Sequence, residues 1–337
     1  SCLDTIDLKV PNEYDDGLVI QGGIFRYKDH AEINVLLSII SDERAQSRIV
    51  RVSKIFVEND KGQKVNLNEN DDGSYGIFLR PNDFNIDYGT KYKVMAETFG
   101  KTVYESSWQE LKVSPQIKSL RYGLIKKPAV IKLNATDSTE FVEFYVDTDV
   151  KNEKYNYKLK FDIINSYKYS SQIEGDDISR VCYVTQRAGL RNVMLFDGTS
   201  SEKESIENLP IFTTQLNYLF SEGYVGTVVM QAVSDSTYSY FNQINELNNR
   251  EGNIYDPPAG RLITNIKNVS NPNGLAYGFF YAVTQDTARI KISPEAVGNP
   301  VRQCPQKPNE TTPCPTRSCC DCLILGGSSL NKPPFWN

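Results

Sequence analysis

Short runs of alternating hydrophobic and polar residues dominate the first third of the chain. Segments 17–27 and 31–40 each alternate over one strand length, and segment 48–79 divides into strand-like runs at the turn signals NDKGQ and NDDGS. Segment 89–108 repeats the pattern, with Gly100 at its turn. About six or seven short strands within about 100 residues predict a β-sandwich.

The rest of the chain also has mainly strand-like patterns. They occur at 129–134, 138–150, 156–170, 180–187 and 224–234, and again within 256–292. One amphipathic helix is predicted within 234–253, where apolar residues recur every three or four positions: Tyr240, Phe241, Ile244 and Leu247. Asp235 or Ser236 can cap its start, and Gly252 can end it. We therefore expect four parts: a tether (1–16), the sandwich (17–115), a β-rich second domain (116–295) and a Cys-rich tail (296–337).

Composition supports a mainly β protein and excludes one class of partner. The 337 residues, 39% of them hydrophobic, can form one large core or two ordinary ones, and 20 Tyr and 15 Phe against 3 Met favour strands. The formal net charge of −5 does not provide the basic surface that nucleic-acid binding requires. No apolar run reaches the roughly 18 residues of a membrane span, and the longest, 33–40, has the length of a strand.

Cys2 and the polar segment that follows it suggest a modified, tethered start. The chain begins Ser1-Cys2, and a cysteine behind a small residue is where bacterial lipoproteins receive their lipid. An ordinary cysteine explains this feature equally well. The residues from Leu3 to Gly17 are polar and acidic, which is typical of a tether.

The other six cysteines are predicted to form three disulfides. They are Cys182, Cys304, Cys314, Cys319, Cys320 and Cys322. The tail has little apolar content, so cross-links would replace a core there, and one tail cysteine must reach the distant Cys182. Connectivity stays open among 15 formal pairings. The alternative is a zinc site that combines the C-x-x-C pair of Cys319 and Cys322 with two further tail cysteines.

Candidate catalytic groups are sparse. The single histidine, His30, lies in the polar turn YKDHAE, and any histidine-dependent nucleophilic mechanism must use it. The acidic pairs Asp15-Asp16, Asp71-Asp72 and Asp176-Asp177 are typical of solvated turns, and 68–74 lacks the complete spacing of a calcium loop. We expect no enzymatic activity, no cofactor and no metal.

Four stretches, taken in order, resemble one protein family. They are LVIQGGI near the start, RVSKIFVENDKGQKVNLNENDDGSYGI, YSYFNQINELNNREGNIYDPPAGRLITNIKNVSNPNGLAYGFFYAV, and the terminal CCDCLILGGSSLNKPPFW. The family is a Bacteroidota outer-membrane lipoprotein family of unknown function (domain of unknown function 4249), and its members are often encoded beside TonB-dependent receptors. The resemblance covers nearly the whole chain and rests on the order of the four stretches.

The resemblance implies a fold and a location but no reaction. The expected fold is mainly β: an N-terminal immunoglobulin-like or transthyretin-like β-sandwich, then a larger β-rich domain with about one helix and a disulfide-clasped C-terminal tail. The expected location is the outer membrane, with the chain lipid-anchored through Cys2 and exposed at the cell surface. The lipid on Cys2 would be the only contact with the bilayer.

The resemblance also brings a modification pattern. Bacteria of this group attach O-glycans to Ser or Thr in the pattern Asp-(Ser/Thr)-apolar or Thr, and the chain contains four matches, at Thr5, Ser138, Ser236 and Thr287. Thr5, in the tether, is the best candidate, whereas the match at Ser236 is better explained as a helix cap.

Three functional hypotheses follow from the resemblance. The first is an accessory or cap subunit of an outer-membrane complex, with a TonB-dependent transporter as its β-barrel partner. The second is a subunit of an outer-membrane protein insertion or secretion machine. The third is an independent surface protein that binds glycans or acts as an adhesin, because tyrosines in polar surroundings, as in NSYKYSSQ and STYSYFNQ, suit sugar stacking. The same tyrosines could equally fill half-buried strand positions.

Overall fold

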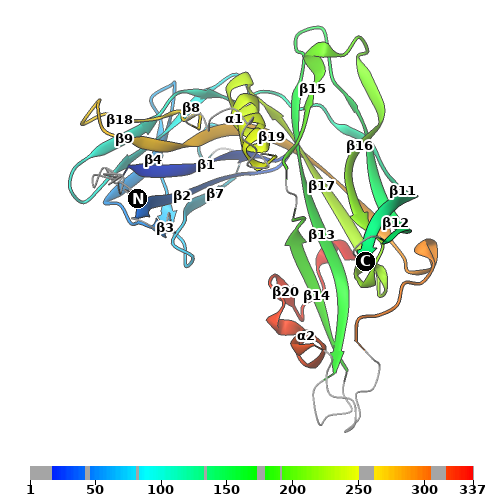
Figure 1. Ribbon diagram of the computed structural model, residues 1–337. Coiled ribbons are helices and arrows are strands. Elements are labelled where there is room, and N and C mark those ends of the chain that lie inside the picture. The colour runs from blue at the N-terminus through cyan, green and yellow to red at the C-terminus, as the bar shows by residue number, and fades with distance from the viewer. Residues whose placement is uncertain are drawn as a thin grey trace, which may run out of the picture. The chain divides into compact units, whose positions relative to one another are not determined.

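The computed structural model describes residues 17–41, 46–80, 83–132, 135–172, 179–189, 192–249, 262–304 and 316–336. The chain is mainly β, with several sheets, and two disulfides join described cysteines near the C-terminus, which confirms the predicted fold class. It divides into two compact units (Figure 1). The first contains the described residues up to Val113 together with Val233–Thr284, and the second contains Ser114–Ala232 and the described residues from Gln285 onward.

The first unit is a sandwich of two sheets. One sheet has the order β19-β1-β2-β7-β6, with β3 also paired to β2. Its strands are β1 (Leu18–Arg26), β2 (Ala31–Ser41), β3 (Gln46–Ile49), β6 (Asn68–Glu69), β7 (Tyr75–Leu79) and the first part of β19 (Ala276–Ile292). The other has the order β18-β9-β8-β4-β5, with β10 paired to β8. Its strands are β4 (Lys54–Asn59), β5 (Lys64–Asn66), β8 (Lys91–Glu97), β9 (Val103–Ser106), β10 (Gln109–Glu110) and β18 (Ile266–Asn268).

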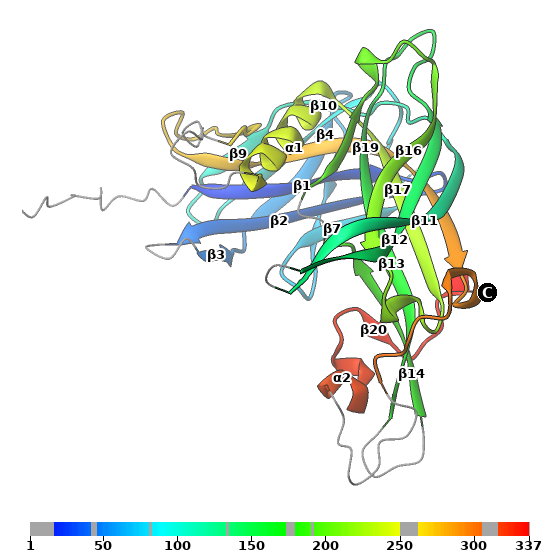
Figure 2. The ribbon, with the colours of Figure 1, turned by 45° about the vertical axis from the view of Figure 1, so that its right-hand side comes forward.

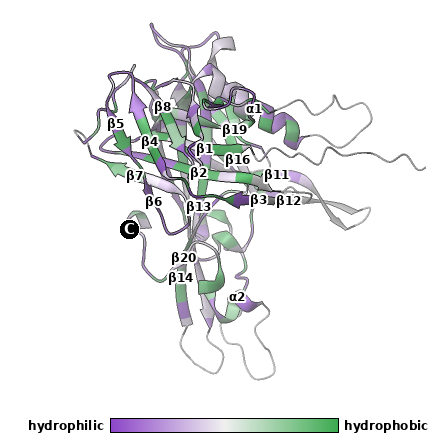
Figure 3. Cartoon of the chain, turned by 90° about the vertical axis from the view of Figure 1, so that its left-hand side faces the viewer, coloured by the Kyte–Doolittle hydropathy of each residue, from purple (hydrophilic) through white to green (hydrophobic). Residues whose placement is uncertain are grey.

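The core of the sandwich follows the alternation of its strands. On β2, Ile33, Val35 and Leu37 are buried, while Asn34 and Leu36 between them face outward. Figure 3 shows the same change between hydrophobic and hydrophilic positions along the strands. The inward residues of both sheets join in one hydrophobic cluster between the sheets.

Strands β1 and β19 form a parallel pair in the first sheet. The register of β1 and β19 runs from Leu18 opposite Ala276 to Arg26 opposite Thr284. Gly278 permits the close approach, because its φ is +95° and a Cβ there would lie 2.1 Å from the carbonyl oxygen of Ile20. This pairing places 233–284 in the first unit, whereas the sequence assigned the whole of 116–295 to the second domain.

Helix α1 (Asp235–Asn248) covers the outer face of β1 and β19 (Figure 2). Tyr240 is buried and stacks on Phe279 with ring centroids 4.6 Å apart. The helix has the predicted amphipathic pattern, but its N-cap is Ser234, whose hydroxyl accepts a hydrogen bond from the backbone N–H of Thr237 at 3.2 Å. The predicted terminator Gly252 lies outside the described residues.

The second unit also has two sheets. An antiparallel three-stranded sheet has the order β11-β12-β16, and the other strands have the order β20-β14-β13-β17-β19, with β15 paired to β13. The residues of β19 from Gln285 onward belong to this unit. The strands are β11 (Ile117–Lys132), β12 (Ala135–Asp149), β13 (Lys158–Gln172), β14 (Ser179–Arg187), β15 (Met194–Asp197), β16 (Ser205–Gln215), β17 (Tyr224–Val233) and β20 (Ser328–Ser329). The core between the sheets includes Phe144, Phe161 and Tyr224.

Short helical turns complete the second unit. They are η1 (Gly198–Ser200), η2 (Tyr218–Phe220), η3 (Glu295–Val297), α2 (Arg317–Cys320), η4 (Cys322–Ile324) and η5 (Pro334–Trp336). β11 begins at Ile117, next to the predicted start of the second domain at 116. It is an edge strand, and this explains both its polar pattern and its tolerance of Pro128, which cannot donate to a strand ladder.

Candidate functional site

The Cys-rich tail is fastened to the strands of the second unit. Disulfides join Cys182 of β14 to Cys322 and Cys304 to Cys319, with Cα–Cα distances of 6.0 Å and 5.3 Å. Cys320 is disulfide-bonded as well. Because Cys319 and Cys322 belong to two different disulfides, the zinc alternative for their C-x-x-C pair is wrong. Cys314 and Cys2 lie outside the described residues.

Non-covalent contacts also hold the tail against the second unit. An Arg180 guanidinium nitrogen lies 2.6 Å from a carboxylate oxygen of Asp321. The tail strand β20 pairs with β14, placing Ser329 opposite Tyr183. The indole of Trp336 is buried and meets the Tyr183 ring edge-on, with centroids 5.2 Å apart. The tail is thus a structural part of the second unit.

The candidate glycosylation residues fall in different surroundings. Ser236 is exposed in the first turn of α1, and its hydroxyl lies 3.0 Å from that of the cap Ser234. Thr287 lies within β19 and is half-buried, beside Asp286, whose carboxylate accepts a hydrogen bond from the backbone N–H of Ile117 at 2.6 Å. Ser138 belongs to β12, and Thr5 lies outside the described residues. Use of these residues as acceptors stays a prediction.

The only histidine of the chain is held between carboxylates and aromatic rings. His30 Nδ1 lies 2.7 Å from Asp29 Oδ1, and Nε2 lies 3.7 Å from Glu32 Oε1. The imidazole stacks on Tyr27 and on Phe78, with centroids 4.3 Å and 4.8 Å apart. Both ring nitrogens therefore face acids and not a hydroxyl or thiol, which gives no support to a nucleophilic mechanism.

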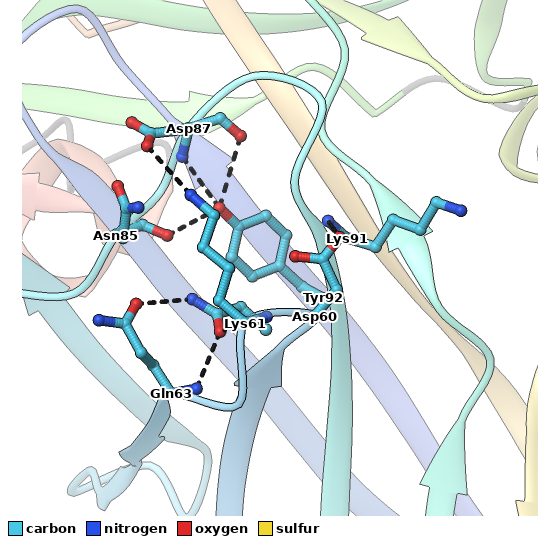
Figure 4. Close-up of polar contacts among 8 residues, drawn as sticks. Asp60, Lys61, Gln63, Asn85, Asp87, Lys91 and Tyr92 are labelled. Atoms are coloured by element: carbon cyan, nitrogen blue, oxygen red, sulfur yellow. Dashed lines mark hydrogen bonds and ion pairs between the residues drawn. The ribbon is translucent and has the colours of Figure 1, made fainter.

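A cavity of about 360 Å³, which we call the loop-end cavity, lies at one end of the sandwich and is lined in part by His30, Gln63, Asn85 and Asp87. Beside it, the buried Tyr92 fastens the preceding loop: its hydroxyl donates to the carbonyl of Asn85 and accepts from the N–H of Asp87, both at 2.9 Å (Figure 4). Burial raises the pKa of Tyr92 to about 12, so the phenol remains protonated. This arrangement resembles a tyrosine corner and has a structural role.

Charged groups at this end neutralise one another. Figure 4 shows the Lys61 ammonium directed at Asp87, and the two groups are 3.7 Å apart. The side-chain N–H of Asn59 donates a hydrogen bond to Gln63 Oε1 at 2.8 Å. Of the predicted acidic pairs, Asp71-Asp72 forms a turn in which Asp72 accepts two hydrogen bonds from Ser74, and these lower the pKa of the Asp72 carboxyl. The other two pairs lie outside the described residues. In the described ranges, no group of three or more His, Cys, Asp or Glu side chains is arranged to hold a metal ion.

A second depression lies on the outer face of β2, β7 and β6. It has a volume of about 390 Å³ and is lined by Glu32, Asn34, Asn68, Asn70, Gly76, Ile77 and Phe78. We call it the β7 groove. Sequence patterns did not reveal it, because YGIFL is an apolar run without visible alternation. The tyrosines of NSYKYSSQ that suggested sugar stacking, Tyr167 and Tyr169, are instead buried in the second unit.

The comparison with known families covers the first three of the four stretches named from the sequence, and the terminal CCDCLILGGSSLNKPPFW lies beyond it. The family described as "Domain of unknown function (DUF4249)" matches residues 4–289. The chain belongs to this family. No curated protein matches it in sequence.

Membership in DUF4249 confirms the family that the four stretches indicated, and it leaves their further implications as predictions. These include the lipid on Cys2, the bacterial group and the transporter partner. The matched range contains the whole described first unit and most strands of the second, and it ends before the disulfide-bonded tail cysteines. Searched over the residues placed in the structure, no helix is long and apolar enough to cross a membrane.

Proposed function

We propose that this DUF4249 protein is a non-enzymatic lipoprotein, anchored to the outer membrane through a lipid on Cys2, that acts as an accessory or cap subunit of an outer-membrane complex. Its proposed partner is a TonB-dependent transporter. The alternatives are a subunit of an insertion or secretion machine and an independent surface protein.

The disulfide-bonded tail carries the proposal. Disulfides persist in oxidising surroundings outside the cytoplasm and are rare where thiols are kept reduced. Cys182 of β14 and Cys322 of η4 are both fully buried, so this cross-link belongs to the folded core of the second unit and is not a product of surface oxidation. A compartment beyond the cytoplasm is where a lipid-anchored subunit would mature.

The surroundings of His30 support a binding role over a catalytic one. Its two nitrogens face Asp29 and Glu32, and the acidic pair that the structure describes forms a hydrogen-bonded turn. The β7 groove and the loop-end cavity are open to contact, and their side chains are paired or solvated. This pattern suits recognition of a partner.

The test is extraction of the full chain from membranes with mild detergent, followed by mass spectrometry of co-purifying proteins and of the N-terminal peptide. We expect an acylated Cys2 peptide and a transporter barrel at near-equal amounts. Cys2→Ala should release the protein into the soluble fraction, whereas Thr5→Ala, in the same segment, should leave it on the membrane.

Each other outcome rejects part of the proposal. An assembly or secretion barrel would select the second hypothesis, and the lack of a stable partner would select the third. A Cys2→Ala variant that remains membrane-bound, or an N-terminal peptide without a lipid, would reject the anchor.

A further inference from the structure

The β7 groove combines an exposed aromatic ring with amide side chains on one strand face. Phe78 and Gly76 are the outward residues of β7, since Tyr75 and Leu79 are buried. The register places Glu32 opposite Phe78, and Asn34 and Asn68 opposite Gly76 from the two neighbouring strands. Residues from three strands therefore converge on one short stretch of β7.

Phe78 is exposed but held in place. Its side chain is 56% exposed, because this strand position points away from the core. One face of the ring is covered by His30, which is itself backed by Tyr27. His30 lines the loop-end cavity and not the groove, while Phe78 lines the groove. The aromatic column therefore fixes the ring with its other face toward the groove.

The floor of the groove depends on a missing side chain. A Cβ at Gly76 would lie 2.7 Å from Asn34 Oδ1 and 3.1 Å from Asn70 Nδ2. Glycine weakens a strand interior, and its presence there often marks a place where a ligand or another backbone approaches closely. A side chain at position 76 would collide with these two amides, so the glycine allows Asn34 and Asn70 to lie close against β7.

The polar groups of the groove are available to a ligand. No residue placed in the structure hydrogen-bonds to the side chains of Asn34 or Asn68, and Asn70 uses one donor to Ser74 Oγ at 3.0 Å. Each amide presents adjacent donors and an acceptor, which match a pair of neighbouring hydroxyl groups. Glu32 is the one charged residue of the lining, so the site offers no cation to an anionic ligand.

We propose that the β7 groove binds one pyranose unit of a neutral glycan. The C–H face of the sugar would lie on the free face of Phe78, and its hydroxyls would bond to Asn34, Asn68 and Glu32. A planar apolar platform beside fixed hydrogen-bonding groups is complementary to a sugar, which has an apolar face and a polar rim. The volume of about 390 Å³ lies within the range of small-ligand sites. The inference does not depend on the proposed barrel partner.

The experiment is electrophoresis of the full chain through native gels that contain starch, β-glucan, galactomannan, mannan or dextran, with alginate and pectin as anionic comparisons. Calorimetry with an oligosaccharide of the retaining polymer then gives the Kd. We expect retardation by at least one neutral polymer. Phe78→Ala should weaken binding about tenfold or more, and Phe78→Tyr, which retains the ring, should stay within about threefold.

Two further variants test whether the glycan binds in the β7 groove and not elsewhere on the protein. Asn34→Ala should also weaken binding, because it removes an amide without touching the ring. Phe99→Ala is the matched control: Phe99 is 70% exposed in the turn between β8 and β9, outside the groove. Phe78 and Asn34 both face solvent, so the variants should retain the circular dichroism spectrum of the parent.

The proposal is overturned if no neutral polymer retards the protein, if only the anionic polymers do, or if Phe78→Ala binds like the parent. These outcomes differ from failure of the proposed function, because Phe78→Ala should still co-purify with the same outer-membrane barrel.

Discussion

Removal of the disulfide between Cys182 and Cys322 should destabilise the second unit more than removal of the disulfide between Cys304 and Cys319. The first closes a loop with a sequence separation of 140, and the second closes one of 15. A cross-link restricts the unfolded chain by an amount that grows with the logarithm of loop length, which gives about 5 kcal/mol for the long loop and about 3 kcal/mol for the short one.

The two double alanine variants are matched in other respects. Each removes two sulfur atoms from largely buried positions, since Cys182 and Cys322 are 0% exposed and Cys304 and Cys319 are 8% and 2% exposed. The loss of stability caused by the cavities is therefore similar in the two variants. The remaining difference of about 2 kcal/mol in their free energies of unfolding reflects loop length. The free energy of unfolding falls by about 2 kcal/mol per molar of urea. Loss of the cross-link alone should therefore lower the unfolding midpoint by about 2.5 M for the long-loop variant and by about 1.5 M for the short-loop variant.

The chain offers a natural reporter for this assay. Of its two tryptophans, Trp336 lies in the second unit and is buried against Tyr183, and Trp108 lies in the first. In a Trp108→Phe background, fluorescence in urea follows the second unit alone. Equal shifts for the two double variants, or a larger shift for the short-loop pair, would refute the entropic reasoning.

Two predictions concern the first unit. Tyr92→Phe should lower its free energy of unfolding by about 1 kcal/mol, because the buried phenol loses its hydrogen bonds to the carbonyl of Asn85 and the N–H of Asp87. Thermal unfolding followed by Trp108 fluorescence in a Trp336→Phe background measures this, and an unchanged midpoint would contradict it. Glu105→Gln should cost about 1 kcal/mol at pH 7. Burial opposes ionisation of Glu105, but ammonium groups of Lys267 and Lys93 at 2.8 Å and 3.0 Å outweigh it, so the pKa of this carboxyl lies below its ordinary value. Its stabilising effect is thus complete above the unfolded pKa of about 4.3 and is lost as the pH falls through the folded value. Urea unfolding between pH 7 and pH 3 should show the two proteins converging in acid, and a constant difference would contradict the assignment.

Local sequence patterns determined most of the secondary structure. Alternation identified β1, β2 and β8, and the turn signals NDKGQ and NDDGS coincide with Gly62 and Gly73, whose φ values are +81° and +79°. The helical periodicity around Tyr240 also gave a real helix. These features depend on residues that are neighbours in sequence, and backbone sterics and side-chain direction therefore express them directly.

Local patterns did not predict which distant strands and cysteines pair. The parallel register of β1 with β19 joins Ile20 to Gly278 and transfers 233–284 to the first unit. The sequence required one tail cysteine to reach Cys182, but several partners were compatible with it, because spacing does not give the three-dimensional separation of two sulfurs. The bond to Cys322 follows from the path of the tail along β14.

In the β7 groove, too, the local sequence predicts a strand, and long-range pairing decides which of its residues are exposed. The sequence determines that Tyr75, Ile77 and Phe78 belong to an apolar strand, but not which of them faces solvent. Side chains alternate with a period of two, so a shift of one residue in register against β2 would exchange the buried and exposed sets. Tertiary packing selected the register that buries Tyr75 and leaves Phe78 on the outer face beside the amides, because the core has room for only one of the two sets.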